Sequence, residues 1–161
     1  MGEVKMQPDE AAAREEIRDL AARYNLYGDT GRTEQEARLF TADGTLEFVD
    51  LDAAPRRYTG HEDIQGFFEG VKSAWLAEIR DTGVSARVFH HLTTHVIDMT
   101  GPRTARGTAY VALIRHFGLA EWGRYTDEYT LTDSGWRFSY RRVTREGEVG
   151  PDGDVRGEVH G

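Results

Sequence analysis

Apolar residues in the first half of the chain recur at the spacing of helices with one buried face. The first such run has its apolar positions at Ile17, Leu20, Ala21 and Tyr24. Gly28 is typical of a helix end, so we expect Asp29 to lie where this helix stops. A second, short helix is expected from Thr33, because Thr33 and Glu36 have the spacing of a capping box. A third is expected after Gly60, with apolar positions at Ile64, Phe67, Phe68, Val71 and Trp75.

The second half of the chain has the pattern of long strands rich in β-branched and aromatic residues. Four strands are expected, over residues 87–99, 104–117, 123–132 and 136–144. Short turns separate them, which favours antiparallel pairing. A further strand pair, with Leu46 and Phe48 in alternation, lies between the second and third helices. This order predicts an α+β domain in which helices cover one face of a curved antiparallel sheet and enclose a pocket.

Length and composition fit a single domain. The chain has 161 residues, of which 39% are hydrophobic and 30% charged, as in globular proteins. We expect the domain to span residues 10–145, after a flexible N-terminus at 1–9. Residues 146–161 have so little apolar surface that they are predicted to form a disordered acidic tail.

Charge and residue content exclude several functional classes. The net charge of −8 disfavours sequence-independent binding to nucleic acids, and the absence of cysteine removes disulfides and thiolate sites. The sequence has neither the apolar core of a signal peptide nor a run of transmembrane length, so we expect a cytoplasmic protein without membrane contact. A small neutral substrate in a buried pocket remains compatible with these properties.

Three of the six histidines lie within the strand-like run VFHHLTTHVIDM. His91 and His95 have the four-residue spacing of a helical zinc site, but in a strand this spacing separates the side chains by about 13 Å. No metal site is therefore expected. Strand alternation places His91 and His95 on one face and His90 on the other, and both faces mix apolar with polar residues. Periodicity alone thus leaves open which histidine faces the interior, or whether all three only complete a half-exposed sheet.

A histidine becomes a general base when a carboxylate orients its ring. Asp29 follows the first helix directly, and Tyr24 on the apolar face of that helix can bring a hydroxyl to the same cavity. The alternatives are a solvent-exposed helix-end aspartate and a tyrosine that only packs in the core. Further polar candidates on the later strands are Tyr110, Tyr125 and Arg142. Arg142 can equally be a strand-end arginine that reaches solvent.

Four segments in this order resemble the SnoaL-like branch of the nuclear transport factor 2-like superfamily. They are REEIRDLAARYNLYGDTGRTEQEARLFTADGTLEF, YTGHEDIQGFF, FHHLTTHVID and GRYTDEYTLTDSGWRFSYRRV. The resemblance implies a cone-shaped α+β barrel, in which three helices pack in a strongly curved antiparallel sheet. It also implies a homodimer or homotrimer that forms through the outer face of the sheet.

Several cofactor-free lyases of this superfamily pair an aspartate after the first helix with a histidine on a long strand. By resemblance, these positions correspond to Asp29 and His91, with Tyr24 as a third catalytic group. The resemblance therefore implies a lyase without metal or cofactor, most simply a dehydratase acting on a small polyketide- or steroid-like molecule. Residues expected to bind that substrate are Phe48, Phe67, Phe89, Tyr110, Tyr125 and Arg142. An isomerase or polyketide cyclase with the same pair of residues, or a non-catalytic binding domain, remains an alternative.

Overall fold

The computed structural model describes residues 8–157, which form three helices and seven strands. In chain order the elements are α1 (Pro8–Asp29), α2 (Thr33–Ala37), β1 (Phe40–Val49), β2 (Arg56–Thr59), α3 (Gly60–Thr82), β3 (Phe89–Gly101), β4 (Thr104–Arg115), β5 (Gly118–Thr132), β6 (Gly135–Val149) and β7 (Val155–Gly157). The expected α+β class and the three helices are confirmed.

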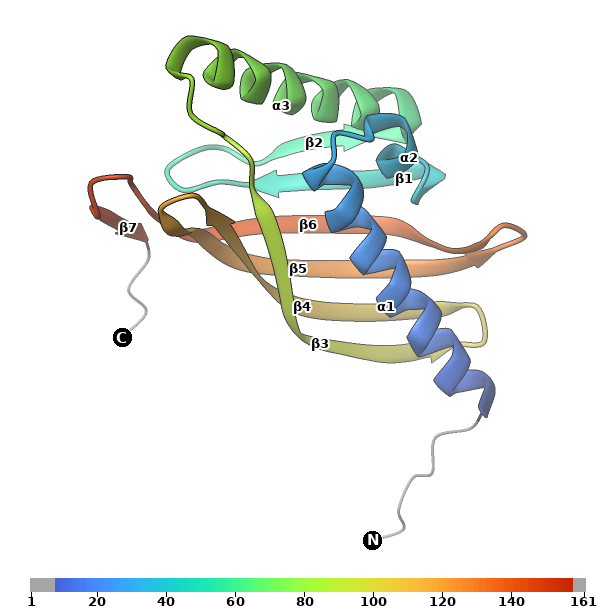
Figure 1. Cartoon of the computed structure of the whole chain (residues 1–161). Helices are drawn as coiled ribbons and strands as arrows, with labels where there is room; N and C mark the ends of the chain where they lie inside the picture. The colour runs from blue at the N-terminus through green and yellow to red at the C-terminus, as the bar shows by residue number, and fades with distance from the viewer. Residues whose placement is uncertain (1–7, 158–161) are drawn as a thin grey trace, which may run out of the picture.

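The strands form one curved sheet in the order β2-β1-β6-β5-β4-β3, and β7 pairs with β6 (Figure 1). β1 and β6 run parallel, whereas every other pair is antiparallel, so the sheet is mixed and the expectation of a purely antiparallel sheet is wrong. α1 packs against β3 and β6, and α3 packs against β1 and β2. Both long helices therefore lie on the concave side of the sheet, where they enclose the core.

The apolar face predicted for α1 is buried, with Ile17, Leu20 and Tyr24 at most 5% exposed. In α3 only the first half is buried, through Ile64 and Phe68, while Val71 is 54% exposed. The second half of α3 is largely exposed and is joined to β4 by the ion pair between Glu78 and Arg115, 2.6 Å apart. The core thus lies between α1, the start of α3 and the concave face of the sheet.

A β-bulge in the middle of β3 changes which residues face inward. Between Thr93 and Val96 the register to β4 shifts by one residue, and Thr94 has the left-handed φ of 53°. Before the bulge the inward residues are His90 and Leu92, and after it they are His95, Ile97 and Met99. One extra residue inverts the alternation, which is why neither face of this strand has a uniform character in the sequence.

A second bulge has the same effect in β6. Tyr129 pairs with Phe138 and Glu128 pairs with Tyr140, so Ser139 is the extra residue. Phe138 is buried before the bulge and Arg141 is buried after it, at 0% exposure for both. The expectation that Arg142 binds the substrate in the cavity is therefore wrong, because Arg142 lies on the face opposite Phe138.

The expected limits of the domain also change. β6 continues to Val149, and Val155–Gly157 pair with it as β7, so part of the predicted tail belongs to the sheet. At the other end, α1 begins at Pro8, within the segment expected to be flexible. Residues 1–7 and 158–161 lie outside the described part of the chain. No helix in residues 8–157 is long and apolar enough to cross a membrane.

Gly28 and the Thr33–Glu36 pair do not have the roles that such residues usually have at helix ends. The first helix runs through Gly28 and ends at Asp29. Thr33 makes no capping hydrogen bond, because it is already the first residue of α2 and Arg32 occupies the cap position. The Glu36 side chain instead packs against Gly28, where an added Cβ would lie 3.0 Å from Glu36 Oε1. Glu36 is thereby buried beside the end of α1 instead of closing a capping box.

Candidate active site

Asp29 and His90 form a carboxylate–imidazole pair between the end of α1 and the start of β3. Asp29 Oδ1 lies 2.5 Å from His90 Nδ1, and Asp29 Oδ2 accepts a hydrogen bond from the His90 backbone N–H at 3.1 Å. Both side chains are mostly buried, with 12% of Asp29 and 22% of His90 exposed. A carboxylate at Nδ1 favours the tautomer in which Nδ1 carries the proton. The Nε2 atom is then left with a free lone pair.

The expected partner of Asp29 was His91, and this assignment is wrong. His91 is exposed on the opposite face of β3, because the inward alternation in this half of the strand includes His90 and Leu92. His95 also points inward, but beyond the bulge, where its Nε2 lies 3.1 Å from the Tyr129 hydroxyl. The three histidines thus occupy three separate environments, and only His90 meets Asp29.

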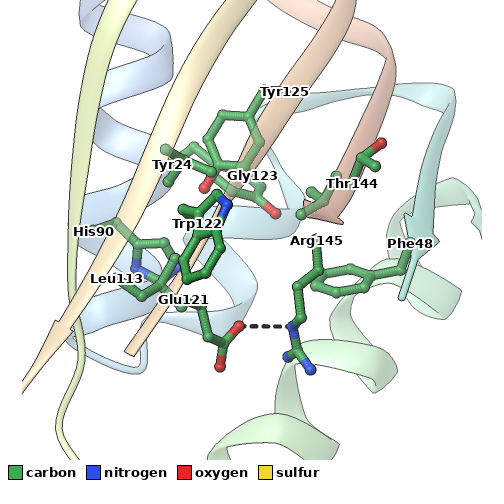
Figure 2. A pocket seen from close by; sticks show the side chains of 12 residues that line it. Tyr24, Phe48, His90, Leu113, Glu121, Trp122, Gly123, Tyr125, Thr144 and Arg145 are labelled. Atoms are coloured by element: carbon green, nitrogen blue, oxygen red, sulfur yellow. Dashed lines mark ion pairs between the residues drawn. The ribbon is translucent and has the colours of Figure 1, made fainter. Parts of the chain in front are cut away.

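His90 lines a pocket on the concave side of the sheet, with about 400 Å³ of space between the lining side chains, part of it open to solvent (Figure 2). Its apolar wall comes from Phe48, Val111, Leu113, Trp122 and Val143, and its hydroxyl groups from Tyr24, Tyr125 and Thr144. At one edge Arg145 Nε lies 2.8 Å from Glu121 Oε2, the ion pair drawn in Figure 2. The pocket is therefore mostly apolar, with a few polar groups around one imidazole.

The two tyrosines of the pocket differ in how their hydroxyl groups are used. The Tyr125 hydroxyl donates to Asn25 Oδ1 at 3.0 Å, whereas the Tyr24 hydroxyl has no acceptor among residues 8–157. The rings meet edge to face, with centroids 5.9 Å apart. Burial raises the pKa of Tyr24 well above its ordinary value, and Glu36 acts in the same direction. Tyr24 is therefore protonated near neutral pH, so its hydroxyl can act as a hydrogen-bond donor.

A second cluster of polar residues lies in the core behind the pocket. Arg141 binds Asp127 with two hydrogen bonds of 2.8 Å, and both residues are at most 1% exposed. Asp127 also accepts a hydrogen bond of 2.7 Å from Tyr129. No group of three or more histidine or carboxylate side chains within residues 8–157 is arranged to hold a metal ion.

Residues 9–142 match the family model of the SnoaL-like domain. The chain belongs to the SnoaL-like family. No curated protein matches the chain. Solved structures do: an NTF2-like protein with a cystatin-like fold from Novosphingobium aromaticivorans is 24% identical, with a TM-score of 0.66 over 89% of this chain and 92% of its own. A candidate scytalone dehydratase from the same organism is 17% identical, with a TM-score of 0.67 over 94% and 91%. LinA is 19% identical, with a TM-score of 0.68 over 93% and 92%.

At these identities the similar structures establish the fold of the SnoaL-like domain and nothing finer. The family and its fold agree with the resemblance found in the sequence. Members of this fold include proteins named for dehydration. The activity of the present domain has to be argued from its own pocket.

Of the residues expected around the substrate, the SnoaL-like pocket contains Tyr24, Phe48 and Tyr125. Phe67 lies directly behind the wall, with its ring centroid 5.6 Å from that of Phe48. Phe89 does not reach the pocket, because it precedes His90 on the outward face of β3, where it is 47% exposed.

Tyr110 and Arg142 are also on the outside of the SnoaL-like domain. Tyr110 is 52% exposed on β4, between the inward residues Ala109 and Val111. Arg142 binds Glu47 on the outer face at 2.6 Å, since the bulge before it turns Arg141 inward instead. Association of two or three copies through this outer face stays a prediction.

Several residues of the site and of the core behind it were not predicted from the sequence, among them His90, Trp122, Arg141 and Arg145. Arg145 falls beyond the predicted end of the last long strand, in a segment whose composition is typical of a tail. Trp122 lies just before the predicted start of a strand. For His90 and Arg141 a signal did exist, since the mixed faces of β3 and the adjacent arginines of β6 both indicate that the simple alternation breaks.

Proposed function

We propose that this SnoaL-like domain is a cofactor-independent lyase, most simply a dehydratase, in which His90 is the general base. The observation that supports this is the 2.5 Å contact between Asp29 Oδ1 and His90 Nδ1 at the wall of an apolar pocket. Asp29 fixes the ring and its tautomer, so that Nε2 is the free basic atom. The proposed catalytic pair is therefore Asp29 and His90, and not Asp29 and His91, the pair expected from the sequence.

In the proposed reaction His90 Nε2 removes a proton from the carbon next to a substrate carbonyl. The Tyr24 hydroxyl donates a hydrogen bond to the carbonyl oxygen as it becomes an enolate. The enolate then re-forms the carbonyl, a carbon–carbon double bond forms, and the β-hydroxyl group leaves with the proton held by His90. One molecule of water is released, and both His90 and Tyr24 return to their starting states. General acid–base catalysis of this kind contributes about 10²–10⁴-fold.

The pocket favours a compact hydrophobic substrate. Only about 60 Å³ of the cavity is accessible to water-sized groups, well below the about 300–1,000 Å³ of typical small-molecule sites, so only the reacting end of a substrate fits without movement of the lining side chains. The walls from Phe48, Trp122 and Val143 exclude water from a planar ring system, and the polar edge at Glu121 and Arg145 leaves room for one hydrated end. A polyketide- or steroid-like β-hydroxyketone has this distribution of polarity.

The proposal is tested with a panel of β-hydroxyketones that carry one, two or three fused rings. Loss of water gives a conjugated enone, whose ultraviolet absorbance is followed with time. His90→Gln is expected to lower kcat/KM by about 10²–10⁴-fold at unchanged thermal stability. His91→Gln is the matched control, because it removes the adjacent imidazole on the opposite face. Full activity of His90→Gln on a substrate of the wild type would disprove the role of His90.

Two further measurements on the same panel separate the alternatives. Exchange of the α-proton with deuterated solvent, without enone formation, would indicate an isomerase or cyclase that uses the same base. Tight binding without exchange or elimination would indicate a binding domain. Only His90-dependent release of water supports the dehydratase.

A further inference from the structure

Arg141 is a fully buried cation that the proposed chemistry does not use directly. Its Nε and Nη2 atoms bind the two oxygens of Asp127, each at 2.8 Å, and its side chain is 0% exposed. Its Nη1 atom is buried without a partner among residues 8–157. A buried ion pair of this kind adds little net stability compared with apolar residues of similar volume. The position of the guanidinium therefore invites a functional explanation.

The guanidinium lies on the ring faces of residues from the pocket and the core. Its central carbon is 4.2 Å from the ring centroid of Tyr24, 4.1 Å from that of Tyr125 and 4.0 Å from that of Phe138. These distances are well inside the range of about 6 Å for cation–π attraction, which is strongest where the cation is desolvated. Asp127 holds the guanidinium at two points, so the cation cannot turn away from the rings.

Tyr24 is the ring on which such a cation has a consequence for the pocket. The Tyr125 hydroxyl is already engaged with Asn25 at 3.0 Å, whereas the Tyr24 hydroxyl is free to meet a ligand. When a phenol donates to an oxygen that gains negative charge, electron density rises on its own ring and oxygen. A cation on the ring face stabilises that density.

The other charged or ionisable groups that act on Tyr24 oppose this effect. Glu36 from α2, and Asp127 and Tyr125 from β5, all disfavour negative charge on the Tyr24 oxygen, and so does burial. Arg141 from β6 lowers the pKa of Tyr24 against them. Arg141 is thus the group that works in the direction needed by a hydrogen-bond donor to an enolate.

We propose that Arg141 is a positioning residue, held by Asp127 beneath the ring of Tyr24, that strengthens the Tyr24 hydroxyl as a hydrogen-bond donor. The link to an enolate rests on the proposed function, but the coupling between Arg141 and Tyr24 does not. It is a property of the free protein and can be measured without a substrate.

The test replaces Tyr24 with a polyfluorinated tyrosine, whose phenol is more acidic and titrates in an accessible pH range, and follows it by fluorine NMR. Asp127→Asn combined with Arg141→Gln removes both buried charges and keeps a polar pair. Because loss of Asp127 alone acts to lower the pKa of Tyr24, Asp127→Asn is measured as the reference, and relative to it the double variant is expected to raise the pKa of the fluorinated residue by about one pH unit. Arg141→Lys keeps the charge and is expected to restore more than half of that difference. Arg142→Gln, a loss of the same charge one residue away on the outer face, should change the pKa by less than a third as much.

An unchanged pKa in the double variant relative to Asp127→Asn, or an equal change in Arg142→Gln, would overturn the inference. Should the variants at Arg141 not fold, the protein with only the fluorinated tyrosine gives the answer. Its Arg141 side-chain nitrogen resonances should shift with the same midpoint as the fluorine signals, and their constancy would also overturn the inference. If the pKa of Tyr24 depends on Arg141 but no turnover depends on His90, only the proposed function is refuted. If turnover depends on His90 but the pKa of Tyr24 does not depend on Arg141, only the role of Arg141 is refuted.

Discussion

Asp29 holds His90 by two different atoms of the same residue: its ring Nδ1 at 2.5 Å and its backbone N–H at 3.1 Å. The two residues are 61 positions apart in the chain, so this contact joins α1 to β3. Because the carboxylate binds the backbone as well as the ring, the imidazole is fixed relative to the strand itself. Such a constraint suits a group whose Nε2 has to meet a substrate atom in a defined place.

Asp29→Asn should remove most of the activity while leaving the fold intact. An amide can keep the geometry, but its NH₂ group favours the wrong imidazole tautomer, with the proton on Nε2. We expect kcat to fall by about 10²–10⁴-fold, measured on whichever β-hydroxyketone the wild type converts. Asp19→Asn, an exposed carboxylate of α1 paired with Arg23, is the control and should be fully active. Equal losses in both variants would argue against a specific role of Asp29.

Removal of one partner from the buried ion pair should destabilise the protein strongly. Arg141→Met leaves the Asp127 carboxylate buried and unpaired, so we expect the free energy of unfolding to fall by about 3–5 kcal/mol. Asp127→Leu together with Arg141→Met removes both charges and should be more stable than the single variant. Urea titrations measure both values. Additive losses in the double variant would contradict this account of the pair.

Glu47 gives the outer face a predictable dependence on pH. Its carboxylate accepts hydrogen bonds from Tyr140, Arg142 and Arg57, which together lower its pKa from 4.5 to about 2. Because the folded pKa is the lower one, this stabilisation is complete above about pH 4.5 and is lost as the pH falls toward 2.

The corresponding variant is Glu47→Gln, expected to lower the free energy of unfolding by about 2 kcal/mol at pH 7. The difference from the wild type should shrink as the pH is lowered through this window. Chemical unfolding at several pH values measures it. A constant difference between pH 7 and pH 2 would show that the ionised form of Glu47 is not what matters.

Thr94 occupies the bulge of β3 with a positive φ of 53°, a conformation that is unfavourable for a β-branched residue. Thr94→Gly should therefore stabilise the protein by about 0.5–1 kcal/mol, since relief of the backbone conformation outweighs the entropy that glycine gains in the unfolded chain. Thr93→Gly, in ordinary strand conformation next to it, should destabilise by a similar amount. Thermal unfolding of the two variants decides the sign. Destabilisation by both would contradict the assigned bulge.

Gly147 supports one wall of the pocket from the end of β6. A Cβ at this position would lie 1.9 Å from a carbon of the Trp122 indole, which has to move if alanine is introduced. Gly147→Ala is expected to cost about 1–3 kcal/mol and to shift the tryptophan fluorescence. Gly150→Ala, where the nearest atom would be 3.8 Å away, is the control and should change neither.

The helices and the sheet could be predicted because their apolar spacing is long and regular, as in the run from Ile17 to Tyr24. The site could be predicted only in part, since Asp29 and Tyr24 follow from the helix but the histidine depends on a bulge. The extra residue at Thr94 places the side chains before it on the opposite alternation from those after it. A strand pattern of period two cannot predict where such an extra residue occurs. In the same way, the extra residue Ser139 in β6 turns Arg141 inward, which the alternation in the sequence does not predict.

The segment after Glu146 illustrates another limit. Its glycines and charges resemble a tail, yet Gly147 pairs with Trp122 and with Gly157. Backbone hydrogen bonds to a neighbouring strand need no apolar side chain, and a glycine is required where an indole lies against the backbone. Amino-acid composition therefore fails to predict a strand whose glycines leave space for the side chains of neighbouring strands.

Asp29 is the last residue of α1, a helix of 22 residues. The carbonyl end of a helix carries a partial negative charge of about half an electron, and that end of α1 lies beside the imidazole of His90. If His90 takes a proton from a substrate, the helix dipole and the Asp29 carboxylate act in the same direction on the resulting imidazolium. The dipole alone contributes about 0.3–1 kcal/mol in such an arrangement. The last turn of α1 thus takes part in the electrostatics of one ring.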